Sequence, residues 1–172
     1  MVSGIDEAAF TGASTAELVT RLAEAKAAAA AASLPGEEAV VIGCDSLLDL
    51  DGQALGKPGS EREAIDRWRA MSGRAGTLIT GHCVINVATG QQAIGCAQTT
   101  VRFGTPSEPE IAAYVKTGEP LAVAGGFTLE GRGGWFIESI DGDHSNVLGI
   151  SLPLTRRLLA SLGINITTLW AR

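Results

Sequence analysis

The sequence predicts a protein of the α/β class, in which helices flank a β-sheet, folded as one domain or as two closely apposed lobes. Segments with helical periodicity alternate along the chain with runs rich in β-branched residues. Of the 172 residues, 45% are hydrophobic and 19% are charged, which is an ordinary composition for a globular protein with a sizeable core. No internal repeat, linker or low-complexity segment is visible. We therefore expect the chain to fold on its own.

The first two elements are expected to be a helix and a strand. Residues 15–32 favour a helix, because Ser14 or Thr15 can cap it, Glu17 lies in its first turn and an alanine tract follows. Residues 40–48 begin with Val-Val-Ile, a run typical of a strand that is buried on both faces. The end of this strand is therefore expected near the core.

Turn and cap residues bound the remaining elements. The dipeptide Asp51-Gly52 is the strongest hairpin signal in the chain, and Ser107 with Glu110 forms a capping box. Gly163 ends the last helix. The predicted elements are helices over residues 61–71, 107–116 and 153–162, and strands over residues 77–87, 91–103, 125–128 and 135–139.

Charge and cysteine content limit the class of function. The net charge is -6, and no cluster of lysine and arginine offers a surface for a nucleic acid polymer. The three cysteines have no CxxC spacing and cannot all pair, which favours reduced thiols in the cytoplasm. The chain starts without a signal-peptide pattern, and no apolar run is long enough for a membrane span.

A carboxylate near the end of the first β run is the strongest candidate for a site. Asp45 follows buried strand residues, where a carboxylate needs hydrogen bonds, a cation or a metal ion. A hairpin at Asp51-Gly52 would return Lys57 toward that strand end, so Lys57 is a plausible partner. The alternative is a surface aspartate and a solvated lysine. A P-loop is excluded, because the glycine spacing is one residue short and Pro58 follows the lysine.

The order of motifs along the chain resembles that of the Maf family of nucleoside triphosphate pyrophosphatases. The match extends over most of the sequence, and its strength lies in the order of many short motifs rather than in any one of them. The motifs are residues 4–7 (Gly-Ile-Asp-Glu), 21–27 (Arg-Leu-Ala-Glu-Ala-Lys-Ala), 43–46 (Gly-Cys-Asp-Ser), 55–58 (Leu-Gly-Lys-Pro), 71–74 (Met-Ser-Gly-Arg), 80–81 (Thr-Gly), 114–120 (Tyr-Val-Lys-Thr-Gly-Glu-Pro), 124–127 (Ala-Gly-Gly-Phe) and 146–149 (Asn-Val-Leu-Gly).

The resemblance implies a mixed, twisted sheet flanked by helices, with a nucleotide held in a cleft between two lobes, as in inosine triphosphatase-like folds. It also implies hydrolysis of nucleoside triphosphates to a monophosphate and pyrophosphate with a divalent metal, Mg²⁺ or Mn²⁺. On this interpretation Asp45 and Glu7 hold the metal or activate water, while Lys26 and Lys57 bind the phosphates and neutralise their charge. Without the resemblance, Lys26 would be read as an exposed helix lysine and Glu7 as part of a solvated acidic end.

Two further positions are expected to affect the choice of base. In the family, the first position directly follows the catalytic aspartate, and here it is Ser46. The second position precedes the glycine that comes after the second glycine-rich strand, and here it is Glu130. Branches that prefer thymidine and uridine triphosphates carry Thr and Gln there, whereas a branch acting on 7-methylguanosine triphosphate has Glu at the second position. A carboxylate accepts hydrogen bonds but cannot donate them as an amide does. The alternative is that Glu130 is simply an exposed turn residue.

The start of the chain departs from the family pattern. Maf proteins usually open with a strand and a Ser-x-Ser-Pro-Arg-Arg loop that grips the triphosphate, and neither precedes Asp6-Glu7 here. We therefore expect residues 1–172 to form a single Maf-like domain that lacks this segment, either because the start codon was assigned too late or because the form is shortened. The sequence leaves open whether this form is active and whether it forms a homodimer. The alternative function is a catalytically weak nucleotide-binding regulator of cell division or septum formation.

Overall fold

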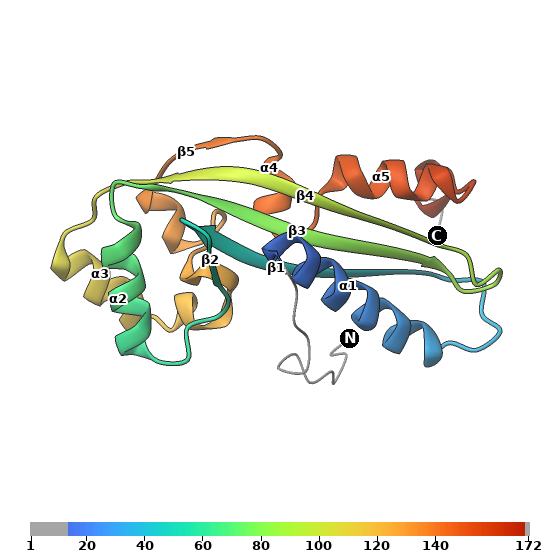
Figure 1. The fold of residues 1–172 in the computed structure, drawn as a ribbon, viewed down its shortest axis with the longest axis horizontal. Helices are drawn as coiled ribbons and strands as arrows, with labels where there is room; N and C mark the ends of the chain where they lie inside the picture. Colours follow the sequence, from blue (N-terminus) through green and yellow to red (C-terminus); the bar gives the residue numbers. More distant parts are fainter. Residues whose placement is uncertain (1–13, 171–172) are drawn as a thin grey trace. The chain divides into compact units, whose positions relative to one another are not determined.

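The computed structural model describes residues 14–170, and Figure 1 shows its helices and strands. The α/β class is confirmed, and the sheet is an open antiparallel one with the strand order β2-β1-β3-β4-β5, which refines the expected mixed sheet. The described helices include none that is long and apolar enough to cross a membrane. The elements are α1 (Thr15–Ala32), β1 (Val40–Leu50), β2 (Gln53–Leu55), α2 (Glu61–Met71), β3 (Ala75–Asn86), β4 (Gln92–Phe103), α3 (Glu108–Lys116), η2 (Glu119–Ala122), η3 (Ala124–Gly126), η4 (Arg132–Phe136), β5 (Ile137–Asp141), α4 (His144–Val147), α5 (Leu152–Ser161) and η5 (Ile166–Leu169).

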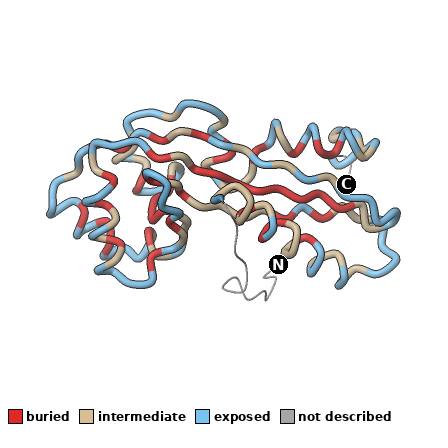
Figure 2. Tube along the Cα trace, viewed as in Figure 1, coloured by how far each residue is buried: buried red, intermediate tan, exposed pale blue. Residues whose placement is uncertain are grey.

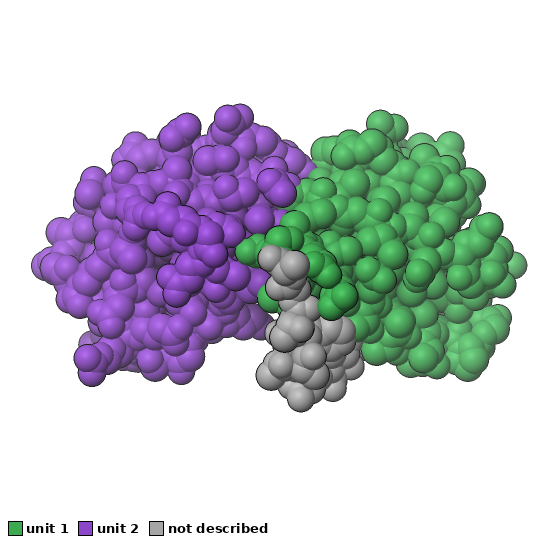
Figure 3. Space-filling model, viewed as in Figure 1, with its two compact units in different colours: residues 1–45, 80–97, 149–172 green, residues 46–79, 98–148 purple. Residues whose placement is uncertain are grey.

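The chain divides into two compact units, coloured separately in Figure 3. Unit 1 contains the described residues up to Asp45, residues 80–97 and the segment from Gly149 onward. Unit 2 contains residues 46–79 and 98–148. Strands β1, β3 and β4 contribute residues to both units, and each unit has hydrophobic clusters of its own.

In unit 1, strand β3 is buried between two helices. Cys83 and Ile85 pack with Ala23 and Ala27 of α1, whereas Val84, on the opposite face of the strand, packs with Leu158 and Leu159 of α5. Successive strand side chains point to opposite faces, so packing by a helix on each face explains why burial is nearly continuous along this strand. Figure 2 shows how much of β3 is buried.

Two glycines allow α1 to approach the strands closely. A Cβ atom at Gly81 of β3 would lie 2.3 Å from the Val19 carbonyl oxygen, and one at Gly43 of β1 would lie 2.4 Å from the Ala23 carbonyl oxygen. Both distances are far too short for any side chain. The helix backbone therefore rests directly on the strands at these two points.

Unit 2 is built around Trp68 of α2, whose side chain is fully buried. Its ring makes edge-to-face contacts with Phe103, Tyr114 and Phe136, at centroid separations of 5.5–5.9 Å. The indole N–H donates to the carbonyl oxygen of Gly126 at 2.9 Å, so the polar atom of this buried ring is satisfied. Helices α2 and α3 and the loops after α3 thus share one core.

The predicted hairpin is confirmed. Asp51 and Gly52 have φ angles of 53° and 82°, and Leu50 pairs with Gln53 across a two-residue turn. Both central residues are in the left-handed region, as a type I′ turn requires, and asparagine, aspartate and glycine tolerate that region best.

Local sequence patterns predicted the bounds of most helices closely, but one predicted strand is wrong. The helices over 15–32 and 61–71 begin and end where they were expected, with Ser14 and Ser60 as caps. The strand expected over 125–128 is absent, because Gly125 and Gly126 have φ angles of 68° and 73° and turn the chain into η3. The strand expected over 135–139 lies two residues later, since a 3₁₀ turn takes up its first residues.

Candidate active site

An ion pair in unit 1 joins two of the predicted site residues. The Lys26 ammonium group of α1 donates a hydrogen bond to Oδ1 of Asp45 on β1. The side chains are only 22% and 10% exposed, so water screens this pair less than it screens a surface pair. The alternative that Lys26 is an exposed helix lysine is therefore wrong.

Close packing of α1 explains how Lys26 reaches Asp45. Gly43 lies two residues before Asp45 on β1 and touches the α1 backbone between Ala23 and Ala27. Lys26 is next to Ala27 in the helix, so it leaves the helix beside the part of β1 that carries the carboxylate. Asp45 lies in the middle of β1, because the strand continues to Leu50, and not near the strand end where it was expected. The alanine-rich sequence and the strand glycine thus place a cation beside an acid.

The neighbouring thiols are not nucleophiles at neutral pH. Burial raises the pKa of Cys44 to about 11, and the charge of Asp45 and the nearby Cys83 add to the effect. Burial, with a contribution from Glu24, likewise raises the pKa of Cys83 to about 11. The thiolate is the reactive form of cysteine, so both side chains stay protonated and unreactive near pH 7.

Lys57 lies in unit 2 on the loop that follows β2. The pairing of β1 with β2 ends at Leu48 and Leu55, and the next residue stays beside β1, because a Cβ atom at Gly56 would lie 3.4 Å from the Leu47 side chain. The chain therefore returns alongside β1 as the hairpin predicted. The Lys57 side chain is exposed, and it makes no ion pair with any residue that the structure describes.

The glycine turn of η3 supports the loop that carries Lys57. The Gly125 N–H donates to the Gly56 carbonyl oxygen at 3.0 Å, and a Cβ atom at Gly126 would lie 3.1 Å from Pro58. Trp68 holds Gly126 in turn through its indole N–H. The residues on both sides of Lys57 are thus attached to the core of unit 2.

A carboxylate at the start of η2 holds the loop that carries Glu130. Glu119 accepts hydrogen bonds from the Thr128 hydroxyl, from the Tyr114 hydroxyl at 3.0 Å, and from the backbone N–H groups of Arg132 and Gly133 at 3.1 and 3.0 Å. Burial by itself raises the pKa of Glu119, but these hydrogen bonds outweigh it and lower the pKa to about 2. Glu130 is exposed at the tip of the loop between the anchored residues.

The remaining predicted positions are only partly described. Ser46 is half-buried, directly follows Asp45 and is the first residue of unit 2. Glu7 lies outside the described residues. The predicted pairing of Asp45 with Lys57 joins residues of the two units and stays a prediction. Within residues 14–170, no group of three or more histidine, cysteine, aspartate or glutamate side chains gathers in a way that could hold a metal ion.

Sequence reasoning missed three polar residues that organise these loops: Glu119, Glu63 and Arg67. Glu119 was noted only as part of the motif of residues 114–120, and its four donors lie at sequence separations of 5–14 residues with no shared periodicity. The i,i+4 spacing of Glu63 and Arg67 is a recognisable helix pair, but it does not reveal that both side chains also bind loop backbone.

Comparison with known proteins identifies the family of this chain. The Maf-like protein family model matches residues 1–162. A protein of Streptomyces coelicolor named nucleoside triphosphate pyrophosphatase is 62% identical, over 99% of this chain and 83% of its own length. Proteins of the same name from Saccharopolyspora erythraea and a Mycobacterium species are 54% and 51% identical, over 98% and 100% of this chain and 85% and 87% of their own lengths. The chain therefore belongs to the Maf-like protein family.

Proposed function

We propose that this protein hydrolyses nucleoside triphosphates between the α and β phosphates, releasing a nucleoside monophosphate and pyrophosphate. The observation that carries the proposal is the partly buried Lys26–Asp45 pair, which joins two motif residues from separate elements. Family membership and the name shared by the relatives support it. Burying such a pair costs solvation energy, and partly buried charged pairs are common in functional sites.

The charged residues divide into two proposed roles. Lys26 and Lys57 would bind phosphate oxygens and neutralise the charge that develops on them as the anhydride bond breaks. Asp45, together with Glu7, would hold a divalent cation or orient the attacking water by accepting its proton. The protonated thiols of Cys44 and Cys83 argue against a covalent thiol intermediate, so water is the proposed nucleophile.

The donor chemistry of Asp45 fits Mg²⁺ or Mn²⁺. These hard cations prefer carboxylate oxygens and commonly use one or two protein carboxylates together with substrate phosphates. When bound, such an ion would withdraw charge from the phosphates and acidify water. The Asp45 side chain is 10% exposed and is held by Lys26, so a cation bound there would meet a carboxylate whose orientation the protein fixes.

The choice of base is proposed to depend on Ser46 and Glu130. Glu130 is exposed on an anchored loop, where its carboxylate could accept hydrogen bonds from the N–H groups of a guanine edge. Ser46 follows the catalytic position directly and supplies a small hydroxyl group. A substrate with donors on its base, such as a guanosine triphosphate or a modified form of it, suits this pair better than thymidine triphosphate does.

Location and assembly complete the proposal. All three cysteines are free thiols, which supports a reducing compartment such as the cytoplasm. We also propose that the protein forms a homodimer. Measuring the mass of the protein in solution would test it.

Pyrophosphate release is the test of this function. We would supply a panel of normal and modified nucleoside triphosphates with Mg²⁺ or Mn²⁺ to the wild type and to Asp45→Asn. We expect Asp45→Asn to lower kcat/KM by about 10³-fold, because it removes the charge that binds the metal or activates water. Asp66→Asn is a matched control, since Asp66 is an exposed carboxylate on α2. Nucleotide binding without turnover of any substrate would refute the enzyme and favour a binding regulator.

A further inference from the structure

We propose that Arg67 and Glu63 of α2 are positioning residues for Lys57, holding its backbone so that its ammonium group meets the phosphates in one fixed place. This inference rests on the proposed function, because it assigns Lys57 to the substrate. It adds two residues that do not themselves touch the substrate.

The two side chains hold the loop on both sides of Lys57. Arg67 donates from its guanidinium to the carbonyl oxygen of Gly56, the residue before Lys57. Glu63 accepts from the backbone N–H of Gly59, two residues after Lys57, at 2.7 Å. Arg67 and Glu63 also pair with each other, so the two contacts form one continuous connection across the base of the loop.

Burial distinguishes Arg67, which contacts the loop, from the other charged residues of α2. The Arg67 side chain is only 14% exposed, although α2 is otherwise rich in exposed charged residues. The Gly59 N–H and then Arg67 lower the pKa of Glu63, so its charged form is favoured while the contacts last. A charged donor on a backbone carbonyl is a stronger contact than a neutral one.

Other contacts also hold the backbone around Lys57 and leave its side chain exposed. Gly125 donates to the same Gly56 carbonyl oxygen that Arg67 binds, and Pro58 is buried against Gly126. The backbone is thus held at Gly56, Pro58 and Gly59, while the Lys57 side chain is exposed. A backbone that is already ordered lowers the entropy cost of substrate binding. A small misplacement of a catalytic group can remove much of the rate acceleration that it provides.

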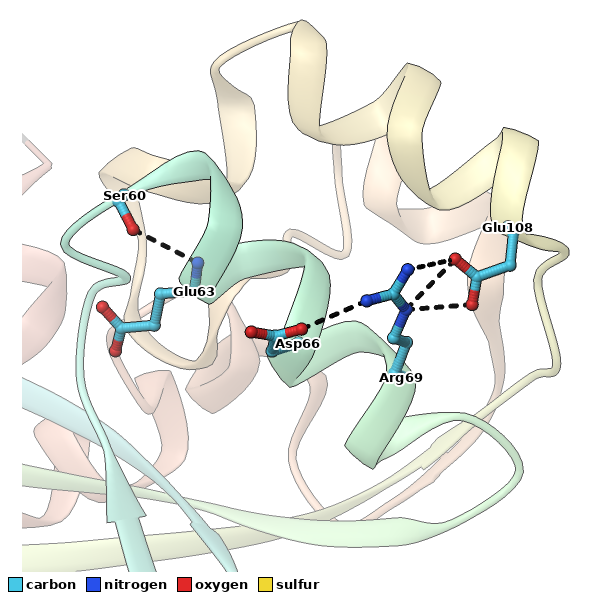
Figure 4. A network of polar contacts seen from close by, with 5 residues as sticks. All are labelled: Ser60, Glu63, Asp66, Arg69 and Glu108. Atoms are coloured by element: carbon cyan, nitrogen blue, oxygen red, sulfur yellow. Dashed lines mark hydrogen bonds and ion pairs between the residues drawn. The ribbon is translucent and has the colours of Figure 1, made fainter.

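Helix α2 supplies a matched control in Arg69. Arg69 also forms ion pairs, but with Asp66 and Glu108 rather than with the loop, and its side chain is 51% exposed. Figure 4 shows Arg69 directed toward Glu108 and away from Ser60, which lies at the loop end of the helix. A substitution at Arg69 therefore changes the charge of α2 without touching the Lys57 loop.

The experiment compares Arg67→Gln, Arg67→Lys, Arg69→Gln, Lys57→Ala and the double variant Lys57→Ala/Arg67→Gln in pyrophosphate release. We expect Arg67→Gln to lower kcat by about 10- to 100-fold with a smaller change in KM. Arg67→Lys should recover part of that loss, and Arg69→Gln should stay within about twofold of the wild type. The decisive variant is the double one, which should be no slower than Lys57→Ala alone, since the loop then has no lysine to position.

Amide hydrogen exchange provides a readout that does not depend on turnover. Exchange at Gly59 should accelerate in Arg67→Gln but not in Arg69→Gln, because Arg67 holds Glu63 in place. Multiplicative losses in the double variant, or unchanged exchange at Gly59, would overturn the positioning role while leaving the pyrophosphatase intact. A wild type that releases no pyrophosphate would instead refute the proposed function. In that case the positioning role of Arg67 would be tested by measuring the affinity for a non-hydrolysable triphosphate. If Arg67→Gln bound this triphosphate as tightly as the wild type does, the positioning role would be overturned.

Discussion

Two lysines of the proposed site are held in opposite ways. Lys26 of unit 1 is fixed through its side chain, which is partly buried and paired with Asp45 on a strand that α1 touches closely. Lys57 of unit 2 is fixed through its backbone, while its side chain is exposed. The first arrangement depends on tertiary packing between a helix and two strands. The second depends on a turn and a neighbouring helix. We therefore expect unit 1 to tolerate much less change around its lysine than unit 2 does.

The largest expected effect is on the packing that supports Lys26. Gly81→Ala should lower the free energy of unfolding by about 3 kcal/mol or more, because its Cβ would overlap the backbone of Val19 and Thr20 at 2.3–2.6 Å. Gly90→Ala is the control, since nothing lies within 4 Å and only its φ of 70° opposes a side chain, at a cost of about 1 kcal/mol. Urea unfolding measures both. Equal losses would show that α1 does not rest on β3 as tightly as described.

The second prediction compares the lysines directly. Lys26→Ala should lower the free energy of unfolding by about 2 kcal/mol, because it removes the ion pair of a carboxylate that is only 10% exposed. Lys57→Ala should change it by less than about 0.5 kcal/mol, since its side chain is exposed. Both variants should still lose activity. Thermal unfolding at several salt concentrations measures both losses. Equal losses in the free energy of unfolding for the two substitutions would contradict the comparison.

A pH experiment extends the comparison to the loop that Glu119 anchors. The pKa of Glu119 is about 2 in the folded protein, below its ordinary value of 4.5, so the charged carboxylate stabilises the fold above about pH 5. That contribution is lost as the pH falls from about 5 toward 2. The shift corresponds to at most about 3.4 kcal/mol. Because the side chain is 19% exposed, we expect about 1 to 2 kcal/mol.

Glu119→Gln provides the measurement for this prediction. Glutamine resembles a protonated glutamate, so its stability deficit relative to the wild type should be largest near pH 6 and shrink toward pH 2. Glu110→Gln is a useful comparison, since the Glu110 carboxylate accepts only from Ser107 among residues 14–170 and lies at an exposed helix start. A deficit for Glu119→Gln that does not depend on pH would show that hydrogen bonding to the charged form is not what holds the loop.

These regions also differ in how far the sequence could predict them. The caps Ser14 and Ser60 and the turn Asp51-Gly52 act within a few residues, so helices α1 and α2 and the hairpin followed from local pattern alone. The Lys26–Asp45 contact did not, because it depends on the depth to which α1 packs at Gly43, and hairpin geometry favoured Lys57 as the partner instead. Lys26 entered the predicted site only through the resemblance of motifs.

The glycines after α3 show a second limit. Gly125 and Gly126 were read as the start of a strand from the apolar residues near them, yet their positive φ angles place them in a tight turn against Leu48 and Pro58. Composition cannot distinguish a strand glycine from a glycine needed for close approach, because both are surrounded by apolar residues. The same limit concealed Glu119, whose partners become neighbours only after this turn has formed.

The smallest expected effect on stability, and the sharpest test of loop function, is Glu130→Gln. The side chain is exposed at the tip of the anchored loop, so the free energy of unfolding should change by less than about 0.5 kcal/mol. The ratio of kcat/KM for guanosine to uridine triphosphate should nevertheless fall by about tenfold, because an amide can donate to a uracil carbonyl oxygen and accepts less strongly from a guanine edge. Steady-state pyrophosphate release on both substrates measures this ratio. An unchanged ratio would return Glu130 to the role of an exposed turn residue, and base selection would then have to be sought at Ser46.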